Sequence, residues 1–192
     1  RTAIMARGHW ETPLGLVPVC QGLAVSIMKG CDLIEESVAS HQSEHAIEVQ
    51  LPFLQALGPC EFVPIAMADY RPDTCRRLGD AVAAAVRAWR EAGHPAPLLI
   101  ASTDLNHYEP ADVSRMKDKL ALDAIQAMDP DGLLSVCDLE DISMCGVGPT
   151  AVILHASKAL GASHAELVRY ANSGEVTGDR ATVVGYASLR II

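Results

Sequence analysis

Short apolar runs alternate with longer amphipathic segments along this chain, and this alternation restricts its fold more than any other feature of the sequence. In residues 73–92, apolar side chains recur at helical spacing and Gly93 follows, so this segment predicts a helix. The apolar run 97–102 comes next and predicts a strand buried on both faces of a sheet. Strands that alternate with helices predict an α/β fold with a central, largely buried sheet.

The rest of the chain continues this pattern. Further strands are predicted over residues 3–6, 61–67, 167–170 and 181–192, and further helices over residues 18–28, from 43 onward, 114–128 and 148–160. Ser43 is the expected N-cap of the helix that starts there, and Pro52 is expected to kink that helix. Residues 7–15 contain many turn-forming residues and predict a loop.

The length of 192 residues predicts a single domain over residues 1–192. Because the chain opens on a predicted strand and not on Met, we expect this domain to lack its N-terminal portion. The net charge of −9, from 15 Lys and Arg against 24 Asp and Glu, argues against nucleic acid as a partner, since nucleic-acid binding needs Lys and Arg to neutralise phosphates.

The apolar stretches and the cysteines limit where the chain works. The apolar stretches, such as residues 81–86, are far shorter than the ~20 residues that cross a bilayer, so no membrane association is expected. The six cysteines include no C-x-x-C pair and are too sparse for a disulfide scaffold. They therefore favour a reducing, cytoplasmic location in which most of the cysteines are small buried apolar residues.

The sharpest local motif, Ser-Thr-Asp-Leu-Asn-His-Tyr at residues 102–108, directly follows residues 98–101, the apolar part of the predicted strand. Ligands of open α/β sheets bind beyond the carboxyl ends of strands, so these polar groups are expected to face a crevice. Asp104 and His107 are three residues apart, a spacing at which a carboxylate can orient an imidazole. His107 could then act as a general base or, when neutral, as a metal ligand. The structural alternative is that Asp104 caps the next turn and His107 packs under it.

Two further segments carry candidate residues. His45 and Glu48 share one face of a predicted helix, although a capping role is the favoured alternative and the zinc-protease pattern is absent. Cys145 precedes a glycine-rich helix start, where the helix dipole favours a thiolate that serves as a nucleophile or as a soft metal ligand. The alternative for Cys145 is a small residue where a strand meets a helix. We expect the strand end that carries His107 and the helix start that carries Cys145 to meet in space.

Five stretches are, taken together, similar to the MEMO family, which includes protein B of the bacterial AmmeMemoRadiSam system. The stretches are WETPLG (10–15), EHAIEVQLPFL (44–54), STDLNHY (102–108), CGVGP (145–149) and VVGYA (183–187). They lie in the family's order over nearly the whole chain. The resemblance implies a fold shared with class III extradiol ring-cleaving dioxygenases, a three-layer α/β/α arrangement with a central mixed sheet.

The resemblance also implies a metal site. It implies Cys145 as the third ligand of a non-haem Fe(II), His107 as the acid–base residue or as a metal ligand, and Asp104 as its orienting partner. His45, Glu48 and Tyr108 are expected to line the pocket. A thiolate also suits zinc or copper. The two N-terminal histidine ligands of the family have no counterpart in this sequence, so we expect this chain to bind metal weakly and to show no turnover.

The function implied by the resemblance is a metal-dependent, dioxygenase-type oxidoreductase that acts on a small diol-like substrate. One alternative is a binding or adaptor protein that retains the metal pocket, as family members that bind phosphotyrosine peptides do. A metal-assisted hydrolase is the other alternative. The resemblance further implies a functional link to AMMECR-type and radical SAM proteins.

Overall fold

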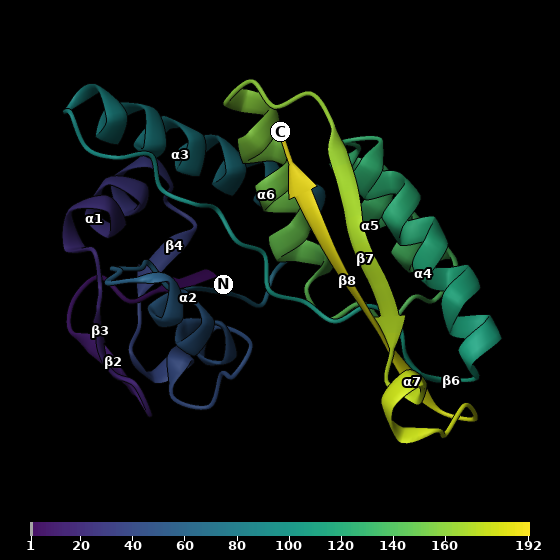
Figure 1. The fold of residues 1–192 in the computed structure, drawn as a ribbon. Helices are drawn as coiled ribbons and strands as arrows, with labels where there is room; N and C mark the ends of the chain where they lie inside the picture. The colour runs from purple at the N-terminus through teal and green to yellow at the C-terminus, as the bar shows by residue number, and fades with distance from the viewer. Residues whose placement is uncertain (1) are drawn as a thin grey trace.

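The computed structural model describes residues 2–192, and within this part of the chain the strands form two three-stranded sheets and a separate hairpin (Figure 1). In the first sheet, β1 (Thr2–Ile4) lies between β4 (Ile34–Glu36), which is parallel to it, and β5 (Ile65–Met67), which is antiparallel. In the second sheet, β8 (Val183–Ile191) pairs antiparallel with both β6 (His107–Glu109) and β7 (Ala165–Asn172). The hairpin consists of β2 (His9–Thr12) and β3 (Gly15–Pro18).

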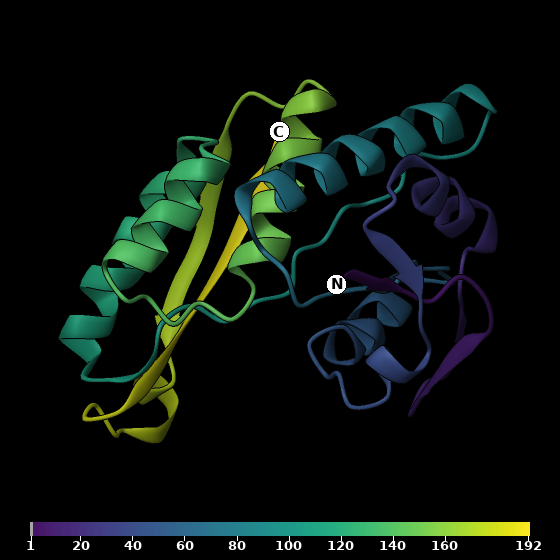
Figure 2. The ribbon, with the colours of Figure 1, turned by 180° about the vertical axis from the view of Figure 1, so that it is seen from behind.

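Seven α-helices are assigned within residues 2–192: α1 (Gln21–Gly30), α2 (Leu51–Leu57), α3 (Pro72–Glu91), α4 (Ala111–Gln126), α5 (Pro130–Leu139), α6 (Val147–Ala159) and α7 (Gly174–Thr177). Short 3₁₀ turns cover Ala39–His41 and Glu48–Gln50. Helix α4 packs against β7 and β8, while α3 packs against α1 and α6 and so joins the two halves of the molecule (Figure 2). The buried faces of these helices form one continuous apolar core that includes Leu78, Leu133 and Leu154.

The mixture of helices and sheets confirms the predicted α/β class, but the strands do not form the single central sheet that was expected. The helices predicted over residues 73–92, 114–128 and 148–160 are confirmed as α3, α4 and α6. Helices α3 and α4 each bury one face, because an amphipathic helix gains most of its stability by burying that face, whereas α6 is buried or half-buried all round over residues 147–156.

The predicted strand over residues 97–102 is wrong. No strand in the described chain pairs with this segment, and Leu98 and Ile100 are 77% and 45% exposed. An apolar run can indicate a buried strand, but a strand exists only where a neighbour supplies the ladder hydrogen bonds. Leu98 and Ile100 alternate with the half-buried Leu99 and Ala101, so the run buries one side only.

Three predictions in the N-terminal half are also corrected. The helix expected from Ser43 begins instead at Leu51, after a 3₁₀ turn, and its N-cap is Gln50. Pro52 therefore lies in the first helical turn, where its missing N–H costs no hydrogen bond and produces no kink. The segment 7–15 was expected to be a loop but supplies β2 and the start of β3.

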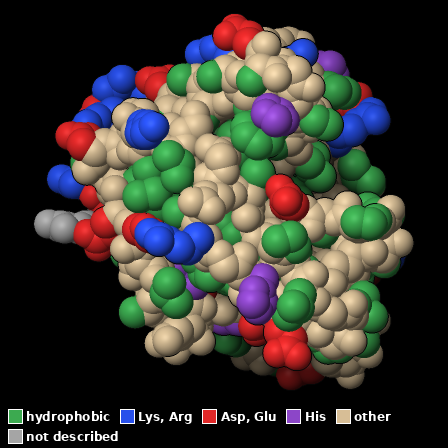
Figure 3. All heavy atoms as spheres, turned by 90° about the vertical axis from the view of Figure 1, so that its left-hand side faces the viewer, with side chains coloured by type: hydrophobic (Ala, Val, Ile, Leu, Met, Phe, Trp, Pro, Cys, Tyr) green, Lys and Arg blue, Asp and Glu red, His purple; other side chains and the backbone are tan. Residues whose placement is uncertain are grey.

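The surface over the N-terminal half carries its hydrophobic side chains in several small groups among charged and polar ones (Figure 3). A shallow hollow of about 740 Å³ lies beside the β2–β3 hairpin. Its lining residues are Leu14, Leu16, Pro18, Gln55, Gly58, Pro59, Cys60 and Glu61. No helix among residues 2–192 is long and apolar enough to cross a membrane.

Candidate metal centre

Two segments distant in sequence meet where the loop before β6 passes the start of α6. The backbone N–H of Asp104 donates a hydrogen bond to Sγ of Cys145 over 3.2 Å. The hydroxyl of Thr103 accepts a hydrogen bond from the backbone N–H of Gly146 at 2.7 Å. A Cβ on residue 146 would lie 2.4 Å from the Cβ of Thr103, so only glycine allows this approach. The expected meeting of strand end and helix start therefore occurs, although the segment before Asp104 is extended chain outside any sheet.

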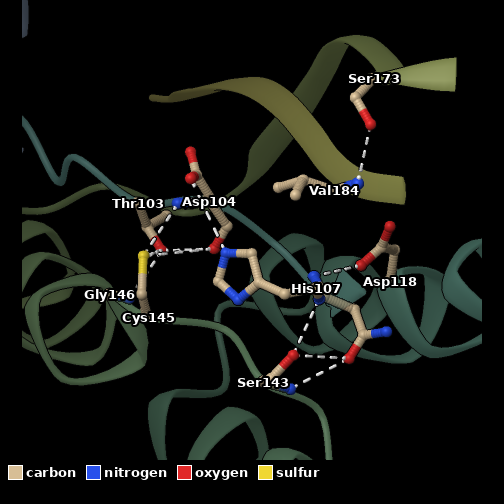
Figure 4. Close-up of polar contacts among 10 residues, drawn as sticks. Thr103, Asp104, His107, Asp118, Ser143, Cys145, Gly146, Ser173 and Val184 are labelled. Atoms are coloured by element: carbon tan, nitrogen blue, oxygen red, sulfur yellow. Dashed lines mark hydrogen bonds and ion pairs between the residues drawn. The ribbon is translucent and has the colours of Figure 1, made fainter. Parts of the chain in front are cut away.

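Three possible ligand atoms converge at this contact. One atom each from Asp104, His107 and Cys145 lies within 4.8 Å of the other two. Nε2 of His107 is 3.7 Å from Oδ2 of Asp104, and its ring points toward the carboxylate and the sulfur (Figure 4). The Cys145 residue is exposed and the Asp104 side chain is 49% exposed, whereas that of His107 is only 18% exposed. The site is therefore open to solvent on the carboxylate and sulfur side.

The donor set and its spacing fit a transition-metal ion. In a tetrahedral site with bonds of about 2.0–2.3 Å, neighbouring ligand atoms lie about 3.3–3.7 Å apart. The 3.7 Å between Nε2 of His107 and Oδ2 of Asp104 agrees with this spacing, and the 4.8 Å limit for the whole set requires only small side-chain movements. A thiolate with an imidazole suits zinc, copper or iron better than magnesium or calcium. Asp104, expected only to orient His107, is thus placed as a possible third donor.

Tyr108 lies beside this cluster in an uncommon backbone conformation. Its φ is +59°, in the left-handed region, and the pairing of β6 with β8 shifts register around it. Its ring centre is 5.6 Å from that of His107, and the residue is 78% exposed. Burial, and then the nearby Asp104 carboxylate and Tyr108, raise the pKa of Tyr186. Tyr108 therefore contacts the His107 ring with most of its own surface exposed, and its role as a pocket residue stays a prediction.

His45 and Glu48 belong to the segment 44–50, which bonds to Ser102 through Ala46 and Gln50. Both are exposed, and neither belongs to the three-donor cluster. The segment is held instead by Ser102, whose hydroxyl donates to the backbone carbonyl of Ala46 at 2.7 Å and accepts from the side-chain amide of Gln50 at 3.0 Å. The carboxylate of Glu44 accepts the N–H groups of Ala46 and Ile47, as a capping residue does.

Three residues behind the cluster had no role assigned from the sequence. Asn106 is 1% exposed, and its side-chain oxygen accepts hydrogen bonds from Ser143. Asp118 is fully buried in α4 and accepts the backbone N–H of Asn106 at 2.8 Å. Burial raises the pKa of Asp118, opposed by its hydrogen bonds to Asn106, Tyr170 and Ser114. One sequence signal was available, since Asp118 is the one charged residue among the buried residues of α4, which are otherwise Ala111, Ser114, Ala121, Leu122 and Ile125.

Comparison with known proteins gives one consistent result. The model of the Memo-like protein family matches residues 1–190. A MEMO1 family protein of Methanopyrus kandleri is 42% identical over 97% of this chain and 65% of its own length. Another, from Thermotoga petrophila, is 42% identical over 96% of this chain and 64% of its own length. The chain thus spans about two thirds of the length of these relatives, and it belongs to the Memo-like protein family.

Proposed function

We propose that this chain contributes Asp104, His107 and Cys145 to a transition-metal site, with iron(II) as the metal. We further propose that the family protein is a dioxygenase-type oxidoreductase for a small diol-like molecule. The observation that carries the proposal is the convergence of a carboxylate, an imidazole and a thiol within 4.8 Å at an open edge of the molecule. Iron(II) with open coordination positions would supply binding and activation of oxygen and of the diol.

The chain's own residues have separable tasks in this proposal. The N–H of Asp104 and the hydroxyl of Thr103 both lie near Sγ of Cys145, at 3.2 Å and 3.7 Å, and fix the position of the sulfur. The Asp104 carboxylate lies against the His107 imidazole and orients it. For His107 the family resemblance allows two tasks: the imidazole binds the metal when neutral or, where other residues hold the metal, takes a proton from the diol.

A zinc-dependent hydrolase is the second candidate function, and the same donor set favours it. Zinc accepts a carboxylate, an imidazole and a thiolate and leaves a fourth position open for water or substrate in catalytic sites. The bound metal separates the two candidates, because iron would support oxygen chemistry and zinc would not. An adaptor function is opposed by the net charge of −9, which weakens the binding of anionic peptides.

The proposal is tested by loading the purified chain with Fe(II) without oxygen and measuring bound iron by elemental analysis after equilibrium dialysis. We expect up to one iron per chain, held weakly and released to a chelator. Cys145→Ser should weaken binding more than about 100-fold, since losing an outer-shell partner alone costs about 10–100-fold. Cys60→Ser is the matched control, because Cys60 is half-exposed and lies outside the cluster.

Nitric oxide then tests for oxygen-type chemistry, since it binds open positions of Fe(II) and gives a characteristic electron paramagnetic resonance signal. Such a signal in the wild-type chain, altered in Cys145→Ser, supports the iron site. The metal site is contradicted if Cys145→Ser and the wild type bind iron equally. Preferential binding of Zn²⁺ without a nitric oxide signal would support the hydrolase instead, and phosphopeptide binding without metal would support the adaptor.

The functional link to AMMECR-type and radical SAM proteins is likewise a proposal, and family membership is its only support. Co-purification with a radical SAM protein from the same cells is the direct measurement.

A further inference from the structure

One buried amide joins the two segments that carry the possible ligands. Asn106 immediately precedes His107, and its Oδ1 accepts the backbone N–H of Ser143 at 3.0 Å and the Ser143 hydroxyl at 3.1 Å. The same Ser143 hydroxyl accepts the backbone N–H of His107 at 2.8 Å. Because Ser143 is two residues before Cys145, these bonds set how far the imidazole lies from the sulfur (Figure 4).

The backbone of Asn106 is itself fixed to the scaffold on two sides. Its N–H donates to Oδ1 of Asp118 in α4 at 2.8 Å, and its carbonyl accepts the N–H of Gly185 in β8 at 2.9 Å. The other oxygen of Asp118 accepts the hydroxyl of Tyr170 at 2.7 Å. A Cβ on residue 185 would lie 2.0 Å from that oxygen, so the carboxylate occupies the space that a side chain on residue 185 would need. Asn106 therefore has little freedom to move.

The orientation of the amide is also determined. While Oδ1 faces Ser143, the NH₂ group donates to the carboxylate of Glu109. Glu109 in turn is paired with Lys117 at 3.0 Å. An asparagine supplies both the acceptor and the donor that this position uses, whereas an aspartate would place a second negative charge against Glu109.

We infer that Asn106 is a positioning residue for the Asp104–His107–Cys145 cluster, which it holds together through Ser143. This inference rests on the proposed metal site and adds the residue that keeps its two segments in register. Partners behind metal ligands commonly affect metal affinity by about 10–100-fold, because they orient the ligand atoms. Asn106 acts in this way through the backbone of His107 and through Ser143.

Co²⁺ is the probe for the test, because a cobalt–thiolate bond gives a charge-transfer absorption that reports sulfur ligation directly. The wild-type chain is titrated with Co²⁺ beside Asn106→Ala, Asn106→Asp and Ser143→Ala. We expect the three variants to bind Co²⁺ about 10–100-fold more weakly with a reduced sulfur band. Ser143→Thr keeps the hydroxyl and should restore both.

The matched control for a merely structural role is Leu122→Ala. Leu122 is buried in α4, the helix that carries Asp118, but it belongs to the apolar core. Leu122→Ala should lower the midpoint of urea unfolding while leaving the Co²⁺ affinity and the sulfur band unchanged. Wild-type affinity and band in folded Asn106→Ala and Ser143→Ala would overturn the inference.

A metal-independent measurement separates this inference from the proposed function. If the wild-type chain gives no sulfur band, the proposed metal site fails, and nuclear Overhauser contacts between the His107 ring and the Cys145 β-protons decide the positioning role. We expect these contacts in the wild type and their loss in Ser143→Ala, which is the mildest variant and the most certain to fold. Contacts retained in Ser143→Ala and Asn106→Ala would contradict a positioning role.

Discussion

The backbone N–H of Asp104 points at the sulfur of Cys145 from 3.2 Å, although 41 residues separate them in the chain. This one contact brings the loop before β6 against the start of α6. It rests on two further features of the same junction, the Thr103 hydroxyl that accepts the N–H of Gly146 and the missing side chain at Gly146. The stability of the junction and the geometry of the metal cluster are therefore linked.

Thr103→Val should destabilise the fold and the junction together. Valine has the shape of threonine but leaves the buried N–H of Gly146 without an acceptor, which costs about 1–3 kcal/mol. The measurement is the free energy of unfolding in urea. Thr103→Ser retains the hydroxyl and should recover most of the loss, and an equal loss in both variants would contradict the role of this hydrogen bond.

Gly185→Ala should destabilise the protein by about 1–3 kcal/mol, the usual cost of overpacking. The added methyl group would lie 2.0 Å from Oδ2 of Asp118, which cannot move away because it is held by the Tyr170 hydroxyl. The destabilisation caused by Gly185→Ala should be smaller in a protein that already carries Asp118→Ala. Additive effects in this double-mutant cycle, measured by urea unfolding, would show that the two residues do not compete for space.

Tyr170→Phe should change stability in a pH-dependent way. The pKa of Asp118 is raised in the folded state, so between its ordinary value and its folded value the folded protein holds more protons than the unfolded chain. Stability therefore falls as pH rises through this window. The hydrogen bond from Tyr170 lowers the pKa of Asp118, so its loss raises the upper pH limit of the window.

We expect Tyr170→Phe to cost about 1.5–3 kcal/mol at pH values above this window, where the charged Asp118 carboxylate loses its partner, and less in acid. Urea unfolding at several pH values provides the measurement. Tyr186→Phe, at a tyrosine that is 42% exposed, is the control and should change little. A cost for Tyr170→Phe that does not vary with pH would argue against a titrating Asp118.

Tyr108→Gly should stabilise the protein, because a non-glycine residue at φ +59° is strained by about 1–2 kcal/mol. Glycine also gives the unfolded chain more entropy, which offsets part of the relieved strain and leaves a net gain in folding stability of about 0.5–1 kcal/mol. Co²⁺ affinity should stay unchanged because Tyr108 supplies no ligand atom. Asp141→Gly, at φ +50° and outside the cluster, is the matched control and should gain a similar amount in thermal unfolding. A loss of stability at Tyr108 alone would mean that its ring contributes more than the strain costs.

The sequence by itself determined the local structure with the strongest periodicity and the identity of the chemical groups. Helix α3 follows from apolar residues at helical spacing, α4 from the Asp-Pro pair that ends it and α6 from the Gly-Pro-Thr run that opens it, and all of these are local properties of the chain. The motifs around His107 and Cys145 named the residues of the cluster, because imidazoles and thiols are few and their chemistry is known before folding.

Tertiary structure alone decided which groups meet. The run 97–102 has the composition of a strand but no partner among the described strands, and pairing is a non-local event that composition does not report. Asp104 joined the donors because a backbone contact across 41 residues placed it there. Asp118 became a buried anchor because Asn106 and Tyr170 supply donors from other parts of the chain. Local patterns set the elements, whereas contacts between distant segments set the site, because its geometry depends on distances that no short stretch of sequence contains.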